Sequence, residues 1–328
     1  MKRKLFSMLL SAFALLLLMG AAAVPEQAEL ILAQEESAAA DGSQALETDS
    51  EIQFEVNAVS AEGEEMPEAT AEAQQTAEEP AVLTDEFILI DGQPAPIEIG
   101  RVQTYDTTYV SLAGMAKALD ETAAAAWNGS TNTVTVTTAN LTMTAHLGDH
   151  YVVANGRYLY VEECVGQNNG TVMVPLSVVT KAFDAKLTWD GKILVQRGTG
   201  ALASGEAFYN QDDLFWLSRV IFAESGNQSL EGKMAVGNVV LNRVASPIFP
   251  NSIHGVLAQK NQFSTYKGGK LANRTPNEGS VSAAKLVLDG GVVEEVENAL
   301  WFDAKCSNSW AARHKSCLAV IGGHKFYG

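Results

Sequence analysis

The stretch Leu214–Gly226 places one carboxylate, Glu224, where it could serve as a general acid. Leu214, Leu217 and Ile221 share one helix face at about 100° per residue. Glu224 lies roughly 60–80° from the centre of that apolar stripe. A carboxylate at the rim of an apolar face loses solvation, which favours the protonated form that a general acid needs. The alternative is a solvated residue in the last helical turn, although a carboxylate there opposes the helix dipole.

The helix that carries this carboxylate has start and stop signals. Asn210 or Asp212 can cap its first turn, and Gly226 suits the left-handed position that commonly ends a helix. Residues 233–244 are apolar nearly all round, which predicts a buried helix that ends before Pro247. The same reasoning predicts a short helix over 252–258, a helix from Pro276 that is closed by Gly290, and a short apolar run over 299–302.

The net charge of −17 belongs to a tail rather than to the folded part. Residues 24–86 hold 18 acids and no Lys or Arg, and Phe54 is their only aromatic residue. Such a segment cannot bury enough surface to offset its ordering entropy, so we expect a disordered acidic linker. Residues 87–328 carry 21 acids and 19 bases, and no basic run indicates binding to nucleic acid.

The N-terminus has the pattern of a secretory signal peptide over residues 1–23. Three bases precede an apolar run from Leu5 to Met19, and Ala21–Ala23 supplies the small residues of a cleavage site. An uncleaved N-terminal anchor is the alternative. No cysteine lies near the cleavage site, so lipid anchoring there is not expected. No later segment is long and apolar enough to span a membrane. These features predict an exported protein.

Three cysteines remain in the exported part, namely Cys164, Cys306 and Cys317. Export permits a disulfide, and a Cys306–Cys317 bond would close a short loop inside one domain. Free buried or half-buried thiols are the alternative. No combination of Cys and His has the spacing of a metal site, so neither a metal nor another cofactor is predicted.

The pattern of residues 87–198 predicts an α+β domain with an internal repeat. In each copy a strand leads to a short helix, a turn marked by Trp and a second strand. Val110 corresponds to Val174 at an offset of 64 residues, and Trp127 corresponds to Trp189 after a two-residue deletion. We expect the two tryptophans in the core, and stacking on sugars is the alternative.

This part of the chain resembles the copper amine oxidase N-terminal domain, a stalk. The resemblance rests on Tyr109–Leu112 and Val174–Leu176, each followed by a helix and a Trp-x-Gly turn. It implies a non-catalytic α+β module over residues 87–198. It does not imply copper, because the sequence offers no ligand set. The small residues of 199–207 predict a linker to a last domain over 208–328.

Residues 208–328 resemble the SleB-like cell wall hydrolases, the family of the spore-cortex lytic enzymes. The motifs that carry the resemblance are Ala223–Ser225, Glu231–Gly232, Ala235–Val244, Ser246–Pro250, Gln262–Ser264, Ala299–Phe302 and Gly322–Tyr327. The resemblance implies a mainly α, lysozyme-like catalytic domain. It also implies that the enzyme attacks the glycan strand of peptidoglycan and that the secreted protein is associated with the cell wall. Spore cortex and vegetative wall are both compatible with the sequence.

By this resemblance Glu224 is the catalytic residue of a peptidoglycan lytic transglycosylase. One carboxylate suffices for that reaction, whereas ordinary glycosidases use two. Residues 225–270 contain Glu231 as their only other acid, and it falls in the next helix. Plain hydrolysis stays open, with Asp303 or Glu278 as a second carboxylate. A wall-binding protein with an inactive domain stays open as well.

The resemblance also implies a substrate groove beside the catalytic carboxylate. The residues expected to bind substrate are Ser225, Gln262, Phe263, Ser264, Trp301, Phe302, His324, Phe326 and Tyr327. Packing in the core is the alternative for the aromatic members of this set. A hydrogen-bonded histidine without a catalytic role is the alternative for His324.

Overall fold

The computed structural model describes residues 84–104, 106–260, 262–305 and 308–328. The predicted signal peptide and most of the acidic linker, residues 1–83, lie outside the described residues. Cys306 of the predicted disulfide lies outside them too, while Cys317 is exposed with a free thiol. Among the described residues, no helix has the length and apolar character needed to cross a membrane.

The N-terminal part of the described chain folds around one hydrophobic core, from Ile88 to Leu202. Its helices are η1 (Ile97–Ile99), α1 (Leu112–Leu119) and α2 (Leu176–Ala182). Its strands are β1 (Thr84–Ile90), β2 (Gln93–Pro96), β3 (Val102–Thr104), β4 (Thr107–Ser111), β5 (Ala124–Asn128), β6 (Thr133–Thr137), β7 (Thr142–His146), β8 (Tyr151–Ala154), β9 (Arg157–Tyr160), β10 (Gly166–Asn168), β11 (Thr171–Pro175), β12 (Lys186–Trp189) and β13 (Ile193–Gln196). The strand orders are β12-β13-β1-β2, β10-β11-β4-β3 and β5-β6-β7-β8-β9. Because β1 starts at Thr84, residues 84–86 belong to this fold and not to the linker.

The two strands that the sequence predicts to be equivalent lie side by side. Strands β4 and β11 pair antiparallel with Val110 opposite Val174, and each runs directly into a helix. Ser111 starts α1, because its hydroxyl accepts a hydrogen bond from Gly114 N at 3.0 Å. A Cβ at Gly114 would lie 2.1 Å from the carbonyl oxygen of Glu98, so η1 can approach α1 only at a glycine.

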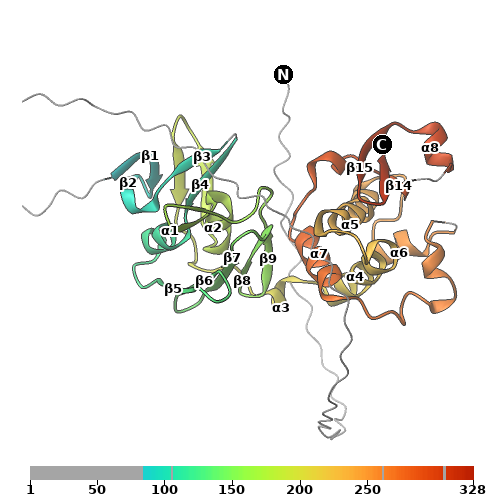
Figure 1. The fold of residues 1–328 in the computed structure, drawn as a ribbon, viewed down its shortest axis with the longest axis horizontal. Coiled ribbons are helices and arrows are strands. Elements are labelled where there is room, and N and C mark those ends of the chain that lie inside the picture. The colour runs from blue at the N-terminus through green and yellow to red at the C-terminus, as the bar shows by residue number, and fades with distance from the viewer. Residues whose placement is uncertain (1–83, 105, 261, 306–307) are drawn as a thin grey trace, which may run out of the picture. The chain divides into compact units, whose positions relative to one another are not determined.

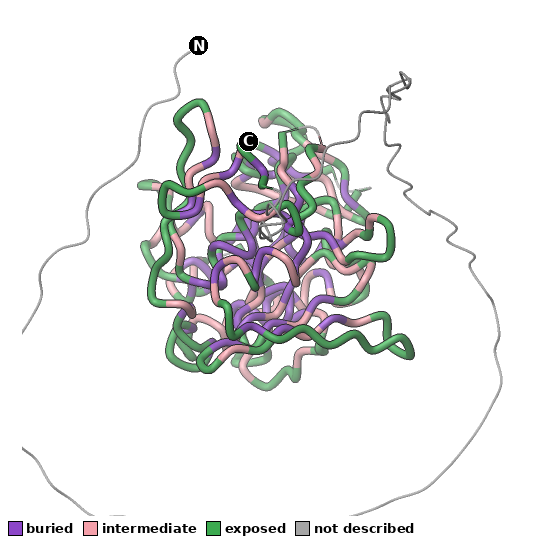
Figure 2. The backbone as a smooth tube through the Cα atoms, turned by 90° about the vertical axis from the view of Figure 1, so that its left-hand side faces the viewer, coloured by how far each residue is buried: buried purple, intermediate pink, exposed green. Residues whose placement is uncertain are grey.

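The prediction that Trp127 and Trp189 belong to the core is wrong. Their exposed fractions are 52% and 64%. Each lies on an edge strand, β5 or β12, whose residues are all exposed. A strand at the edge of a sheet has a neighbouring strand on one side only, so an aromatic residue on it can remain exposed. Figure 2 shows buried backbone in the interior and exposed backbone along turns and edges.

The predicted linker 199–207 is packed against the N-terminal core. Leu202 is 5% exposed and belongs to that core. Helix α3 (Gly205–Phe208) follows, and Gly205 N donates to the carbonyl of Asn155 at 2.8 Å. A Cβ at Gly205 would lie 2.4 Å from the carbonyl oxygen of Gly156. Small residues therefore serve close packing here rather than flexibility.

The C-terminal part has a second core, from Leu217 to Phe326, which mixes helices and strands. Its helices are α4 (Gln211–Ser225), α5 (Leu230–Ala245), α6 (Ile253–Ala258), η2 (Ser264–Gly269), α7 (Glu278–Leu288), η3 (Glu294–Val296) and α8 (Trp310–His314). Helices α4, α5 and α7 pack against one another (Figure 1). A sheet of order β14-β16-β15 completes it, with β14 (Trp301–Ala304), β15 (Cys317–Ile321) and β16 (His324–Tyr327). The buried helix predicted over 233–244 is confirmed as part of α5.

A buried ion-pair cluster joins the two parts, which belong to one compact unit. The carboxylate of Asp289, at the end of α7, is 1% exposed and lies 2.6 Å from Arg157 and 2.7 Å from Lys181. The hydroxyl of Tyr209 donates to it at 3.2 Å. Burial alone raises the pKa of Asp289, but hydrogen bonds and charges from Arg157 and Lys181 outweigh burial and lower it.

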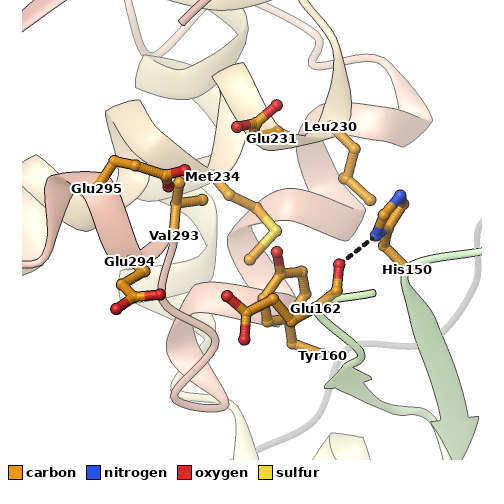
Figure 3. A pocket seen from close by; sticks show the side chains of 9 residues that line it. All are labelled: His150, Tyr160, Glu162, Leu230, Glu231, Met234, Val293, Glu294 and Glu295. Atoms are coloured by element: carbon orange, nitrogen blue, oxygen red, sulfur yellow. Dashed lines mark hydrogen bonds between the residues drawn. The ribbon is translucent and has the colours of Figure 1, made fainter. Parts of the chain in front are cut away.

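A cavity of about 270 Å³ near the same boundary is lined by carboxylates (Figure 3). Glu162 comes from the N-terminal part, and Glu231, Glu294 and Glu295 come from the C-terminal part. His150 Nδ1 lies 2.8 Å from the backbone carbonyl of Glu162. Burial and then the charge of Glu294 raise the pKa of the Glu162 carboxyl. In the described part of the chain, no His, Cys, Asp and Glu side chains are arranged to hold a metal ion.

The raised pKa of Glu162 predicts a pH-dependent contribution to stability. The folded state takes up this proton more readily than the unfolded chain, so the contribution is present at low pH and is lost as pH rises through the folded pKa. Urea unfolding of wild type and Glu162→Gln from about pH 4 to about pH 7 measures this contribution. The free energy of unfolding of the wild type should rise relative to that of the variant as pH falls. Glu121→Gln, on the exposed turn after α1, controls for the general effect of removing one acid. A difference that does not change with pH would contradict the assignment.

Candidate active site

Helix α4 presents Glu224 as the sequence predicts. Asn210 is the N-cap, and its side-chain oxygen accepts hydrogen bonds from the backbone N–H groups of Asp212 and Asp213 at 2.9 and 3.1 Å. Leu217 on the predicted stripe is 0% exposed, while Glu224 is half-buried. The carboxylate therefore sits at the rim of the C-terminal core.

The predicted left-handed position of Gly226 is wrong. Its backbone is right-handed, with φ −57° and ψ −25°. A Cβ on this residue would lie 2.5 Å from the carbonyl oxygen of Phe222 and 2.8 Å from its ring. Glycine is needed because the last turn of α4 packs tightly on Phe222, and the sequence gives no sign of this contact.

The Glu224 carboxylate is held by a residue that the sequence analysis missed. The hydroxyl of Thr265, in η2, donates to Glu224 Oε1 at 2.8 Å. Gln262 and Ser264, two predicted substrate-binding residues, are exposed on the same loop. The loop therefore provides one neutral hydrogen-bond donor to the carboxylate and two polar side chains to solvent. Only its adjacency to the Gln262–Ser264 motif could have suggested Thr265.

His324, at the start of β16, lies close enough to Glu224 for the two to interact. Burial lowers the pKa of His324, and the charge of Glu224 together with a hydrogen bond to its backbone raises it by less. His324 is therefore neutral at neutral pH. Its Nδ1 is buried and has no hydrogen-bond partner among the described residues. The structure thus brings the carboxylate and a neutral imidazole together.

The hairpin turn before His324 is fixed to the loop between α4 and α5 by Gln228. Gly323 N donates to Gln228 Oε1 at 2.8 Å. Gly322 has a φ of +54°, and a Cβ there would lie 2.3 Å from the same oxygen. The positive φ favours glycine at position 322, whereas a Cβ at Gly323 would meet Gln228 only at ordinary contact distance. Gln228 was also missed, because its role depends on a contact with a turn far along the chain.

Strands β14 and β16 sort the predicted aromatic residues onto two faces. Phe302 pairs with Phe326, and the next pair on that face is Ala304 with His324. The ring centroid of Phe302 lies 5.6 Å from that of His324 and 6.3 Å from that of Phe263. Phe302 is half-buried and lies on the face that carries His324. Through its contact with His324 it belongs to the surroundings of Glu224.

The opposite face carries Trp301 and Asp303. Trp301 packs against Phe249 and Trp310, with ring centroids 6.3 and 6.1 Å apart. The carboxylate of Asp303 accepts a hydrogen bond from Ser309, which caps α8. The alternation of side chains separates both residues from His324, so the prediction that Trp301 lines the groove is corrected. Asp303 is excluded from the role of second carboxylate for the same reason.

Three further predicted substrate-binding residues are too buried for that role. Ser225 and Phe326 are 0% exposed, and Tyr327 is 3% exposed. The Ser225 hydroxyl donates to the carbonyl of Ile221 at 2.8 Å. The prediction is wrong for these residues, which close the core. Phe263 is 4% exposed and packs in the core. Core packing was the alternative that the sequence analysis left open for the aromatic residues.

An aromatic cavity of about 430 Å³ lies on the same loop and was not predicted. Phe263 and Tyr266, which flank Thr265 in sequence, both line it together with Trp216 of α4. The Trp216 ring packs against His254 with centroids 4.7 Å apart, and the Tyr266 hydroxyl lies 2.9 Å from His254 Nε2. The cavity offers a preformed aromatic surface beside η2, the segment that carries Thr265.

Comparison with known protein families matches both parts of the chain. Residues 227–327 match the Cell Wall Hydrolase family, and residues 89–195 match the Copper amine oxidase N-terminal domain. The C-terminal part is a cell wall hydrolase domain. The match to this hydrolase domain begins at Asn227, so Glu224 itself lies just before it.

Relatives of the hydrolase domain are spore cortex-lytic enzymes. One from Bacillus cereus is 37% identical over 81 residues, which are 25% of this chain and 30% of that protein. One from Oceanobacillus iheyensis is 28% identical over 119 residues, 36% of this chain and 42% of that protein. The chain thus spans less than half the length of either relative. Among solved structures, the chain is similar to the catalytic domain of the germination-specific lytic transglycosylase SleB from Bacillus anthracis. The sequence identity is 29% and the TM-score is 0.33. The match covers 39% of this chain and all of that one.

Proposed function

We propose that the protein is an exported enzyme that cleaves the glycan strand of peptidoglycan by lytic transglycosylation, with Glu224 as its one catalytic carboxylate. The observation that carries the proposal is the half-buried Glu224, held by Thr265 and close to a neutral His324, beside a cell wall hydrolase domain. The names of the relatives, spore cortex-lytic enzyme and germination-specific lytic transglycosylase, support this substrate class.

In the first step Glu224 acts as general acid. Thr265 holds Oε1, which leaves Oε2 to carry the proton and give it to the glycosidic oxygen as the bond from that oxygen to the sugar C1 breaks. The leaving sugar departs as an alcohol. Glu224 is then an anion beside a C1 that carries developing positive charge, which it stabilises electrostatically.

In the second step the Glu224 carboxylate acts as base. It takes the proton from the 6-hydroxyl of the same sugar while that oxygen bonds to C1, which closes a 1,6-anhydro ring and restores the protonated acid. No water enters the product. One carboxylate completes the cycle, and the position of Asp303 on the opposite face of β14 argues against a paired-carboxylate mechanism with that residue. Glu278, the other candidate for a second carboxylate, is exposed at the start of α7.

Product analysis separates this reaction from its alternatives. Mass spectrometry of digested peptidoglycan should find 1,6-anhydro ends. New reducing ends would instead indicate hydrolysis by the same site. Absence of released fragments would indicate a wall-binding protein without activity and would overturn the proposal.

The wider architecture forms part of the proposal. Residues 1–23 direct export, the acidic linker follows, and a non-catalytic stalk built from two repeats precedes the hydrolase domain. The core of α4, α5 and α7 supports a lysozyme-like arrangement of that domain. The mature protein is then associated with the cell wall, where its substrate lies.

Replacing Thr265 by Val tests how the carboxylate is held. The variant keeps the shape of the side chain and removes the donor to Glu224 Oε1, so the turnover rate should fall about tenfold, as expected for one hydrogen bond to a charged group. Thr275→Val, on an exposed loop before α7, is the matched control and should retain wild-type turnover. Turnover of Thr265→Val equal to that of the control would contradict a role in holding Glu224.

A further inference from the structure

The stalk contains a groove of about 580 Å³ whose most exposed wall is aromatic. Trp189 and Leu187 point to the same face of β12, and they are 64% and 38% exposed. The rings of Trp189 and of Phe87 in β1 make an edge-to-face contact. Their centroids lie 5.4 Å apart, and their planes meet at 60°. Together Phe87, Leu187 and Trp189 give one wall of the groove a contiguous apolar surface, and such exposed apolar patches commonly mark binding sites.

The indole is held in place rather than loosely exposed. The guanidinium of Arg101 stacks over the Phe87 ring, 4.6 Å from its centroid. Arg101 Nε in turn donates to Asp85 at 2.6 Å. This chain of contacts orients Phe87, which orients Trp189. A preoriented ring binds a ligand at lower entropic cost than a mobile one.

The facing wall is polar and includes one carboxylate, Asp106. It comes from the second sheet and from the start of α2, with Gln103, Thr108 and Ser177 among its residues. The Thr108 hydroxyl donates to Gln103 Oε1 at 2.7 Å, which fixes both side chains. The cation at the groove, Arg101, is already paired with Asp85. The groove thus sets an apolar ring against hydroxyl and amide groups.

This combination matches a sugar ring, which has an apolar C–H face and polar hydroxyl and acetamido edges. A phosphorylated or strongly acidic ligand would need unpaired cations, and an apolar peptide would leave the polar wall without partners. We infer that the Trp189 groove binds a glycan strand of peptidoglycan and holds it while the hydrolase domain cleaves. The identity of the glycan rests on the proposed function.

The test measures binding separately from cleavage. In full-length protein that carries Glu224→Gln, cosedimentation with purified peptidoglycan gives an affinity. Trp189→Ala should weaken it about tenfold, equivalent to about 1.4 kcal/mol. Trp189→Phe should recover most of the loss, because an aromatic face remains. Trp127→Ala is the matched control, since Trp127 is 52% exposed on an edge strand and does not line the groove.

A second measurement uses Trp189→Ala with Glu224 intact. Its turnover of short soluble glycan fragments should equal that of wild type, since Trp189 lies outside the active site. Equal affinity of Trp189→Ala and Trp127→Ala for peptidoglycan would overturn the inference. So would dissociation of a dimer by Trp189→Ala, which would make a second copy the occupant. Failure of the proposed function is a different result, namely no cleavage by the wild type.

Discussion

Glu224→Gln should reduce the release of soluble fragments from peptidoglycan by about a thousandfold, because an amide can neither donate the proton nor take one back. The substitution is nearly isosteric, and the amide oxygen can still accept the hydrogen bond from Thr265. The fold and the surroundings of the carboxylate should therefore persist, and the loss should fall on turnover rather than on substrate affinity. The loss of turbidity of a peptidoglycan suspension measures the rate.

Glu231→Gln is the matched control for this variant. Glu231 is the next acid along the chain, exposed in the first turn of α5, and it lines the carboxylate cavity near the stalk. Its replacement should leave the rate within about twofold of wild type, as for an exposed residue away from the site. Comparable losses in both variants would point to a general effect of removing acids and would contradict the assignment of Glu224.

Asp289→Ala should destabilise the protein by about 3 kcal/mol, because it leaves the charge of Arg157 buried without a partner. The Arg157 side chain is 11% exposed, while the 44% exposed Lys181 can recover solvent. Urea unfolding measures the change. Glu86→Ala removes the exposed pair with Lys192, 3.7 Å apart, and should cost at most about 0.5 kcal/mol. Equal costs for the two variants would show that the Asp289 cluster does not hold the domains together.

The contribution of Asp289 also has a defined pH dependence. Its folded pKa is lowered, so its stabilisation is complete above the ordinary pKa of an aspartate, about 3.9, and is lost as pH falls through the folded pKa. The difference in stability between wild type and Asp289→Ala should therefore shrink in acid. This trend is opposite to the one expected for Glu162.

Local sequence signals predicted the elements around the site well. The apolar stripe of α4, the Asn210 cap and the apolar α5 depend on residues within one helix, so periodicity and capping rules suffice to find them. The position of Glu224 at the rim of the core follows from the same local reasoning. The strand of Trp301 and Phe302 was also anticipated from its short apolar run.

Contacts between distant segments were not predictable in this way. Thr265 forms a hydrogen bond to α4, and Gln228 forms one to the hairpin before β16. Hydrophobic periodicity cannot predict hydrogen bonds between such distant segments. Ser225 matched a motif, yet tertiary packing buries it completely. The register of β14 with β16 decides which aromatic residues face His324, and a strand predicted alone has no register.

The exposed tryptophans illustrate the reverse error. Trp127 and Trp189 were expected in the core because large aromatic side chains are usually buried. The sheet orders place their strands at the edges, and every residue of both strands is exposed. A residue that breaks a general rule in this way is a candidate for function, and Trp189 is the one that lies in a groove.

The central claim is that Glu224 alone drives an intramolecular closure of the sugar ring. Digestion of peptidoglycan in isotopically labelled water, followed by mass spectrometry of the new chain ends, tests it most directly. The wild type should give 1,6-anhydro ends without label, and Glu224→Gln should give almost no new ends. Labelled reducing ends from the wild type, or equal numbers of new ends from both proteins, would contradict the claim.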